Sequence, residues 1–336
     1  MSCPFAICGY GRIGRLVLRI WAQNNWALHP VAINEPAQAP NMLYLTQFDS
    51  AHGAFSHPIT LENEHFYLKQ QKIALSHFEK TEDLKWFAHF DLLLECSGKY
   101  QTRAQLNALL KKGGQCVLVS NPTQTEKDVD ATIIFGFNEH TLTGKEKIIS
   151  AASCTTLASV PIVHFLHEQI GIERVFVTTL HSAMNDQPVA DGYHHKDLRR
   201  TRSALLSIIP IETGLSSGIE RLVPALKNKV VARAVRVPTL NVSALDMTLE
   251  LSQSIALNDL QHLLQHATQE KHLPFVATTS GAHASIDFNH NAHSAIIDFS
   301  QMRQNGKTVQ LFIWFDNEWA FSYRFLQLAE FVAKNL

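Results

Sequence analysis

Short apolar runs recur along the first 150 residues, and stretches with helical periodicity separate them. The apolar runs occupy residues 5–8, 30–34, 90–96, 115–119 and 131–135. Almost continuous apolar runs of this length are typical of strands buried on both faces, with helices such as 103–112 covering a parallel sheet. The segment 47–85 is less regular and indicates only short strands and turns. The first part of the chain is therefore predicted to be α/β, with a doubly wound parallel sheet.

In the second half of the chain the apolar residues alternate with polar ones, which is typical of strands that bury one face. Such strands are predicted at residues 175–181, 229–237, 242–251, 284–288, 294–299 and 308–315. Helical periodicity is found at 257–269 and at 319–334. We therefore expect a second α+β domain with a mainly antiparallel sheet. The predicted boundaries are 1–152 for the first domain, 153–317 for the second, and 318–336 for a C-terminal helix that packs back on the first.

A glycine-rich turn follows the first predicted strand. Gly9-Tyr-Gly-Arg-Ile-Gly14 has the G-x-G-x-x-G spacing, opens an amphipathic helix and precedes a second apolar strand that ends in Glu35. In such a Rossmann-type unit Gly9 allows the tight turn, Gly11 lets the backbone approach a pyrophosphate, and Gly14 permits close helix packing. Glu35 lies 35 − 9 = 26 residues after the first glycine. A carboxylate there accepts hydrogen bonds from a ribose and repels a 2′-phosphate, so the sequence predicts NAD rather than NADP as cofactor.

Two serines directly follow predicted strands of the same sheet. Ser97 comes after the strand at 90–96, and Ser120 comes after the strand at 115–119. Ligands of doubly wound sheets lie at the carboxyl ends of the strands, so both serines are candidate cofactor contacts. The alternative to a cofactor site is that the glycine-rich turn at residues 9–14 is purely structural and binds no ligand.

Cys154 lies in a run of small and hydroxyl residues, Ser150-Ala-Ala-Ser-Cys-Thr-Thr-Leu157, that precedes a helical stripe ending before Gly171. We expect Cys154 in the first turn of this helix, where free backbone N–H groups favour the thiolate and make it a candidate nucleophile. His181 ends a predicted strand and offers a base with a near-neutral pKa. The simpler alternatives are a small buried cysteine and one of 18 ordinary histidines.

The arginines provide candidate anion contacts. The run Asp197-Leu-Arg-Arg-Thr-Arg202 is dense in positive charge, and Arg236 stands at the end of a predicted strand. Arginine suits two-point binding of phosphate oxygens, whereas a solvated charged face is the alternative for the run. Since the 336 residues carry a net charge of −1, nothing in the overall balance indicates a nucleic-acid or membrane partner. Any anionic ligand must be bound locally.

Composition also limits the cellular context and the metal content. With no leader pattern and no apolar run of spanning length, the protein is expected to be cytoplasmic. Five scattered cysteines favour neither disulfides nor a zinc site. The histidine pairs come without matching cysteine or carboxylate ligands, so no metal is predicted. These pairs are His164 with His167, His194 with His195, and His290 with His293.

The combined motifs resemble the phosphorylating glyceraldehyde-3-phosphate dehydrogenase superfamily over essentially the whole chain. The motifs, in order, are GYGRIG, ASCTT, TTLHSAMNDQ, DLRRTR, RVPTLNVSA and FDNEW. Within that superfamily, the segments 183–187 and 285–295 are most similar to the erythrose-4-phosphate dehydrogenase branch.

This resemblance implies a homotetrameric NAD-dependent dehydrogenase that acts on a phosphorylated aldehyde. Cys154 adds to the aldehyde, and His181 takes the proton before a thioester forms. The cofactor contacts that the resemblance implies are Gly9, Arg12, Ile13, Glu35 and Asn317, the last of which orients the nicotinamide amide. The spacing and the strand ends described above add Gly11, Gly14, Ser97 and Ser120. The implied substrate contacts are Arg200, Thr213 and Arg236, and Ser153 and Thr155 beside Cys154 are further candidates.

Four positions depart from the family pattern. Met184 replaces a usual threonine whose hydroxyl helps to hold a phosphate, which favours water over inorganic phosphate as the acyl acceptor. Leu157 replaces a usual asparagine, Cys8 replaces another, and Pro36 follows Glu35 directly. Three hypotheses follow: oxidation of D-erythrose 4-phosphate to 4-phospho-D-erythronate for pyridoxal 5′-phosphate synthesis, glycolytic oxidation of glyceraldehyde 3-phosphate with phosphate, and a catalytically weak NAD-binding regulatory protein.

Overall fold

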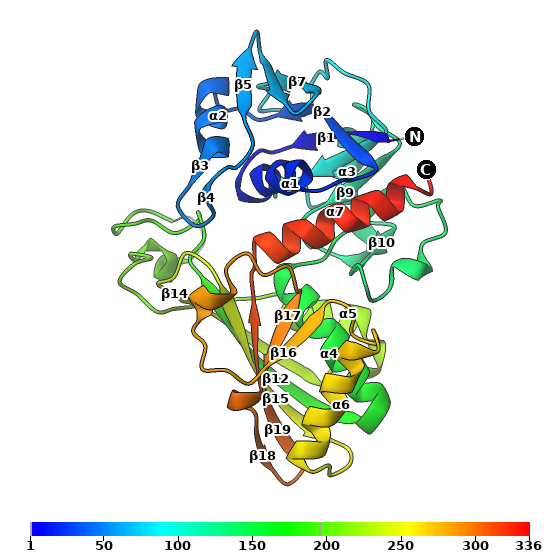
Figure 1. Cartoon of the computed structure of the whole chain (residues 1–336), viewed down its shortest axis with the longest axis vertical. Coiled ribbons are helices and arrows are strands. Elements are labelled where there is room, and N and C mark those ends of the chain that lie inside the picture. The colour runs from blue at the N-terminus through cyan, green and yellow to red at the C-terminus, as the bar shows by residue number, and fades with distance from the viewer. Residues whose placement is uncertain (1, 195–196) are drawn as a thin grey trace. The chain divides into compact units, whose positions relative to one another are not determined.

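The computed structural model describes residues 2–194 and 197–336, so His195 of the predicted histidine pairs lies outside the described part. The chain divides into two compact units (Figure 1). Unit 1 consists of Met1–Ser153 with Ser322–Leu336, and unit 2 consists of Cys154–Phe321. None of the helices in the described ranges combines the length and the apolar character that crossing a membrane requires.

Unit 1 is built on a sheet whose strands run in the order β10-β11-β9-β8-β1-β2-β7-β6-β5, nine within the described ranges. From β10 to β7 neighbouring strands are parallel, and β5 and β6 add an antiparallel edge. The prediction of a doubly wound parallel sheet is confirmed. The strands are β1 (Cys3–Cys8), β2 (Leu28–Asn34), β3 (Phe48–Asp49), β4 (Gly53–Ala54), β5 (Ile59–Glu62), β6 (His65–Leu68), β7 (Gln71–Ser76), β8 (Leu92–Glu95), β9 (Cys116–Val119), β10 (Ala131–Thr132) and β11 (Ile148–Ser150).

Helices cover this sheet because each presents an apolar stripe to it. The helices of unit 1 are α1 (Arg12–Gln23), α2 (Ala39–Gln47), α3 (Arg103–Leu110) and most of α7 (Trp319–Ala333). Leu16, Val17 and Ile20 of α1 are buried, and burial of such side chains stabilises the unit by about 1.5–3 kcal/mol each. The C-terminal part of α7 packs here, since Glu330 accepts a hydrogen bond from the backbone N–H of Ala27 at 2.7 Å.

Unit 2 contains a mainly antiparallel sheet, as predicted, with the strand order β13-β14-β12-β15-β19-β17-β16 and β18 beside β19. The β12–β14 and β16–β17 pairs are its parallel neighbours among the described strands. The elements are β12 (Ile172–Ser182), β13 (Ile209–Ile211), β14 (Val230–Val237), β15 (Ser243–Leu251), β16 (Val276–Thr279), β17 (Ala295–Asp298), β18 (Arg303–Asn305), β19 (Thr308–Phe315), α4 (Cys154–Ile170), α5 (Leu215–Leu222) and α6 (Leu257–Gln269).

The two faces of the unit 2 sheet differ. Figure 1 shows α4, α5 and α6 gathered on one side of the strands. In the same sheet, Phe176 of β12 is paired in register with Val231 of β14. The two residues remain 46% and 57% exposed. Adjacent exposed apolar side chains on a sheet are typical of an interaction surface.

Several predicted elements are wrong or incomplete. The strand predicted at 284–288 is a short 3-10 helix, Ser285–Phe288, because Asp287 turns the chain by accepting the backbone N–H of Ala284 at 2.8 Å. The strand predicted at 131–135 is paired only over Ala131–Thr132. Elements α2, α5, β11, β13 and β16 were not predicted individually. All five are short, so hydrophobic periodicity gives little signal for them.

Candidate active site

The glycine-rich turn of unit 1 has the geometry of a dinucleotide cradle. Gly9 adopts φ +88°, and a Cβ there would lie 2.4 Å from the backbone N and Cα of Ser97. A Cβ on Gly14 would lie 2.2 Å from the carbonyl oxygen of Gly9, whereas one on Gly11 would meet nothing within 4 Å. The backbone is therefore tightly packed at Gly9 and Gly14 and open at Gly11, at the N-terminus of α1. An anionic group fits there.

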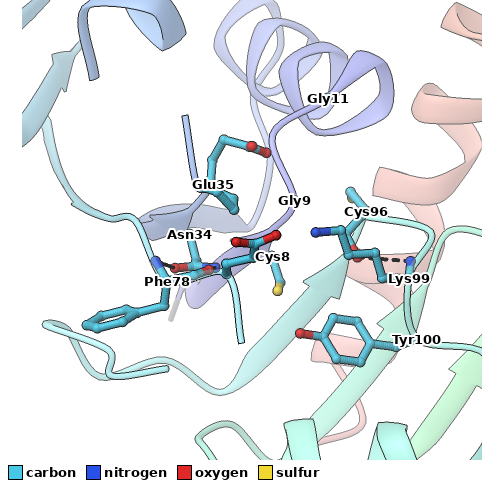
Figure 2. Close-up of a pocket in the computed structure, with 12 residues that line it drawn as sticks. Cys8, Gly9, Gly11, Asn34, Glu35, Phe78, Cys96, Lys99 and Tyr100 are labelled. Atoms are coloured by element: carbon cyan, nitrogen blue, oxygen red, sulfur yellow. Dashed lines mark hydrogen bonds between the residues drawn. The ribbon is translucent and has the colours of Figure 1, made fainter. Parts of the chain in front are cut away.

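A pocket of about 210 Å³ adjoins this turn. Figure 2 shows Gly9 and Gly11 leading into α1 beside the Glu35 side chain, with Lys99 and Tyr100 across the pocket. Oε2 of Glu35 accepts the backbone N–H of Tyr10 at 2.7 Å, which fixes the carboxylate against the turn. The donors and acceptors around this pocket suit a nucleoside, so the residues present fit an NAD cofactor.

The other predicted cofactor residues of unit 1 have different surroundings. Arg12 forms an ion pair with Asp49, and its neighbour Ile13 lies in the first turn of α1. Ser97 lines the pocket and donates its backbone N–H and hydroxyl to Oε1 of Glu95. Ser120 directly follows β9, and its backbone N–H donates to the carbonyl oxygen of Glu95 at 2.9 Å. Both serines therefore lie at the carboxyl ends of adjacent strands.

Folding brings Cys154 and His181 together in unit 2. Cys154 is the first residue of α4, as predicted, and its Sγ lies 3.6 Å from Nε2 of His181 near the end of β12. Ser153 and Thr155 flank the cysteine in the chain, and Thr155 is buried. A thiol and an imidazole within hydrogen-bond reach are the parts that nucleophilic catalysis needs.

Nδ1 of His181 faces two partners of opposite kind. It lies 2.9 Å from the carbonyl oxygen of Ser182 and 2.5 Å from Nη1 of Arg236, which itself lies 3.3 Å from the same oxygen. A guanidinium only donates, so a bond from Arg236 requires the proton on Nε2, whereas a proton on Nδ1 donates to Ser182 and leaves Nε2 as an acceptor facing the sulfur. Removal of the thiol proton uses this second tautomer. Burial, and then the charge of Arg236, lower the pKa of His181 to about 4. The imidazole is therefore neutral at pH 7 and able to take a proton.

The thiol of Cys154 is influenced by the same arginine. Burial raises its pKa to about 11, while the charge of Arg236 acts in the opposite direction. Arg236 is a buried residue with an exposed fraction of 8%, so little water screens this effect. Arg236 therefore favours the thiolate and the neutral imidazole together.

We predict that Arg236→Gln raises the pKa values of both His181 and Cys154, because a positive charge beside them is removed. Alkylation of Cys154 by iodoacetamide, followed by peptide mass spectrometry across pH, measures the thiol. Its inflection should move to higher pH by about one unit. Arg233→Gln, on the exposed part of the same strand, is the matched control and should leave the inflection in place. An unmoved inflection in Arg236→Gln contradicts the role given to its charge.

Asn317 is held rigidly between β19 and α7. Its Oδ1 accepts hydrogen bonds from the hydroxyls of Ser243 at 2.7 Å and Ser182 at 3.1 Å. The preceding Asp316 caps α7 by accepting the backbone N–H groups of Glu318 and Trp319 at 3.0 and 2.7 Å. The Asn317 side chain is thus fixed in orientation, as a residue that binds a carboxamide requires.

The remaining predicted substrate residues also lie in unit 2. Arg200 pairs with Asp186 at 2.7 Å, and Asp186 also stabilises the charged form of Arg236. Thr213 precedes α5, where its hydroxyl accepts the backbone N–H of Leu215 at 3.2 Å. The two arginines and the helix start are suited to anions, although Asp186 neutralises part of the positive charge.

Sequence reasoning missed three acidic residues around these sites: Asp49, Asp186 and Glu95. Asp49 and Asp186 are the ion-pair partners of predicted arginines, and sequence alone does not show which acid pairs with which base. Glu95 could have been noticed, because it is a single ionisable residue at the end of an apolar strand. Among the described residues, no group of three or more histidine, cysteine or acidic side chains is placed to hold a metal ion.

Comparison with known families agrees with this geometry. Residues 3–103 match the family described as "Glyceraldehyde 3-phosphate dehydrogenase, NAD binding domain", and residues 153–317 match "Glyceraldehyde 3-phosphate dehydrogenase, C-terminal domain". The protein is thus an NAD-dependent oxidoreductase. More particularly, the chain belongs to the glyceraldehyde-3-phosphate dehydrogenase superfamily.

Proposed function

We propose that this enzyme oxidises D-erythrose 4-phosphate to 4-phospho-D-erythronate and thereby feeds pyridoxal 5′-phosphate synthesis in the cytoplasm. The approach of Cys154 Sγ to His181 Nε2 carries the proposed chemistry. Support for the four-carbon substrate comes from Met184, which stands where a phosphate-binding hydroxyl is usual and whose side chain is 47% exposed. A thioether offers no hydrogen-bond donor to a phosphate.

In the proposed mechanism, Cys154 attacks the aldehyde carbon while Nε2 of His181 takes the thiol proton. The free N–H groups at the start of α4 stabilise the oxyanion of the thiohemiacetal. Protonated His181 returns this proton to the oxyanion, and the neutral imidazole takes it again as the hydride leaves the carbon and a thioester forms on Cys154. NAD held at the glycine-rich turn would supply the hydride acceptor for this oxidation.

The cofactor and substrate roles given to the other residues are part of the same proposal. Glu35 binds the adenosine ribose, the N-terminal turn of α1 around Arg12 and Ile13 holds the pyrophosphate, and Asn317 orients the nicotinamide amide. Arg200, Thr213 and Arg236 bind the substrate phosphate, with Ser153 and Thr155 beside the thioester. Water activated by His181 releases the product, because Met184 weakens binding of inorganic phosphate.

A homotetramer is the proposed assembly. The exposed pair Phe176 and Val231 supports it, together with exposed apolar side chains on the segment after Gln187, namely Val189, Leu198 and Leu206. Side chains of this kind are stable in water when another subunit covers them. Sedimentation equilibrium of the purified chain measures the assembly directly.

NADH formation with two aldehydes, each with and without inorganic phosphate, tests the proposed reaction. We expect turnover of erythrose 4-phosphate that does not require phosphate, because water is the proposed acceptor. Phosphate-dependent turnover of glyceraldehyde 3-phosphate would instead assign the glycolytic reaction. Stoichiometric NAD binding without any turnover would indicate a regulatory protein, with Leu157, buried in α4 where asparagine is usual, as the first residue to examine.

A further inference from the structure

A buried carboxyl group lies at the carboxyl end of β8. Glu95 is fully buried, and its Oε1 accepts the backbone N–H of Ser97 at 2.7 Å and the Ser97 hydroxyl. Its Oε2 has no hydrogen-bond partner within residues 2–194 and 197–336. A buried carboxyl with one satisfied and one bare oxygen is stabilised when it keeps its proton.

Neutral donors rather than cations surround Glu95. Cys8 of β1 is paired with Glu95 in register, and its thiol and the backbone of Gly98 lie close enough to the carboxyl to lower its pKa. Among the described residues, no lysine, arginine or histidine forms an ion pair with Glu95. The other polar groups nearby are Cys96 and Tyr100 after β8, Ser120 after β9, Glu35 after β2, and Lys99, which lines the adjoining pocket.

The pKa of Glu95 reflects these surroundings. Burial raises it to about 7, while the hydrogen bonds from Ser97 act in the opposite direction. Burial also raises the pKa of Cys8 and of Tyr100, so both keep their protons near neutral pH. Glu95 therefore changes its charge in a range where these two neighbours do not.

Glu95 is coupled to the dinucleotide turn through direct contact. Ser97, which bonds to the carboxyl, is packed so closely against Gly9 that a Cβ on the glycine would lie 2.4 Å from its backbone. Cys8 lines the same pocket as Gly9 and Gly11 (Figure 2), and Ser97 lines it as well. The carboxyl is thus linked through Ser97 to the turn that would hold a pyrophosphate, a group with two negative charges.

We propose that Glu95 is a positioning residue that supports the dinucleotide turn as a neutral acid and weakens cofactor binding when it ionises. The anionic cofactor makes the ionised form of Glu95 more costly, so it binds the protonated form more tightly. The dissociation constant therefore increases as the pH rises above neutrality. A rise of about one unit in the pKa of Glu95 when the anion binds corresponds to a change of about tenfold in the dissociation constant.

Calorimetric binding of ADP-ribose to the full chain, from about pH 6 to about pH 8.5, tests this proposal. ADP-ribose lacks the nicotinamide, and its pyrophosphate is fully ionised throughout this range. For the wild-type protein we expect the dissociation constant to rise about tenfold. Glu95→Gln keeps an acceptor oxygen for Ser97 but is neutral at every pH, so its dissociation constant should stay at the low-pH value. A wild-type dissociation constant that does not change with pH overturns the proposal.

His77 is the control, because it is a second titratable group in contact with the backbone of Glu35. Its Nδ1 faces the carbonyl oxygens of Glu35 and Ala37 at 2.9 and 2.7 Å, and its Nε2 lies 2.9 Å from Glu64. Despite the opposing effect of burial, these partners raise the pKa of His77. His77→Gln should keep the wild-type pH profile. If the dissociation constant of ADP-ribose is independent of pH in His77→Gln but keeps its wild-type pH dependence in Glu95→Gln, the histidine causes the effect and the proposal is rejected.

Stability provides a readout that does not involve the cofactor. Because the pKa of Glu95 is raised in the folded state, the folded protein binds this proton more tightly than the unfolded chain does. The stability that this proton contributes is lost as the pH rises from about 4.5 to about 7. Glu95→Gln should therefore have a higher melting temperature than the wild type above pH 7 but not near pH 5.

If Glu95→Gln does not fold, Cys8→Ser offers a stronger hydrogen-bond donor and should move the binding inflection to lower pH. An unmoved inflection in Cys8→Ser then counts against the proposal. ADP-ribose binding is independent of which aldehyde is oxidised, so this test and that of the proposed reaction fail separately.

Discussion

Replacing Cys154 by serine is expected to reduce NADH formation at least about 10³-fold while leaving NAD binding intact. The hydroxyl of serine is a far weaker acid than the thiol, and the neutral imidazole of His181 cannot generate an alkoxide from it at pH 7. The substitution changes little in volume, so α4 should keep its first turn. Steady-state absorbance of NADH and calorimetric NAD binding measure the two properties separately.

Cys3→Ser is the matched control for this variant. Cys3 begins β1 in unit 1 and is only half-buried, so the same chemical change there should leave the rate within about twofold of wild type. Retention of most of the activity by Cys154→Ser would show that another group attacks the aldehyde, and the proposed covalent mechanism would then be wrong.

Gly9→Ala is expected to weaken NAD binding by about 100-fold or more and to lower the free energy of unfolding by about 1–3 kcal/mol. The added Cβ would lie 2.4 Å from the backbone of Ser97, so β1 and the turn after β8 must separate. Backbone atoms cannot rotate away as a side chain can, and the cradle for the pyrophosphate is lost. Calorimetric NAD binding and urea unfolding followed by tryptophan fluorescence measure the two effects.

Gly53→Ala separates strain in the backbone from the clash. Gly53 also has a positive φ, +70°, but a Cβ there would meet nothing within 4 Å. Its cost should be limited to about 1 kcal/mol, with NAD binding unchanged. Equal losses of NAD affinity in both variants would mean that the close approach to Ser97 is not what shapes the turn.

The dinucleotide turn was predictable because its signal is local. Gly9, Gly11 and Gly14 occur within six residues, directly between a strand and a helix, so spacing alone specifies the geometry. The helix at 257–269 was also predicted with its observed bounds, since its apolar stripe is regular over 13 residues. Long periodic segments of this kind are the ones that sequence patterns define best.

The proposed catalytic pair could be suggested but not placed from sequence. Cys154 and His181 are 27 residues apart, and their approach depends on where α4 and β12 pack in the folded unit. The contact of His181 with Arg236 depends in turn on the parallel pairing of β12 with β14, which places Arg236 opposite His181. No periodicity reveals such pairing between strands that are far apart in the chain. For the same reason the bare oxygen of Glu95 was not foreseen.

The side chains that perform the proposed chemistry are held by different parts of unit 2 from two side chains proposed to affect substrate recognition. His181 is part of strand β12, and Asn317 is tied to β12 and β15 through the hydroxyls of Ser182 and Ser243. Met184 and Arg200 lie instead on the long connection between β12 and β13, where insertions and substitutions disturb little else. In evolutionary terms, substrate range can diversify by changes in this connection while the proton-transfer apparatus is inherited unchanged. Related enzymes should accordingly differ in the aldehyde they accept more readily than in the way they oxidise it.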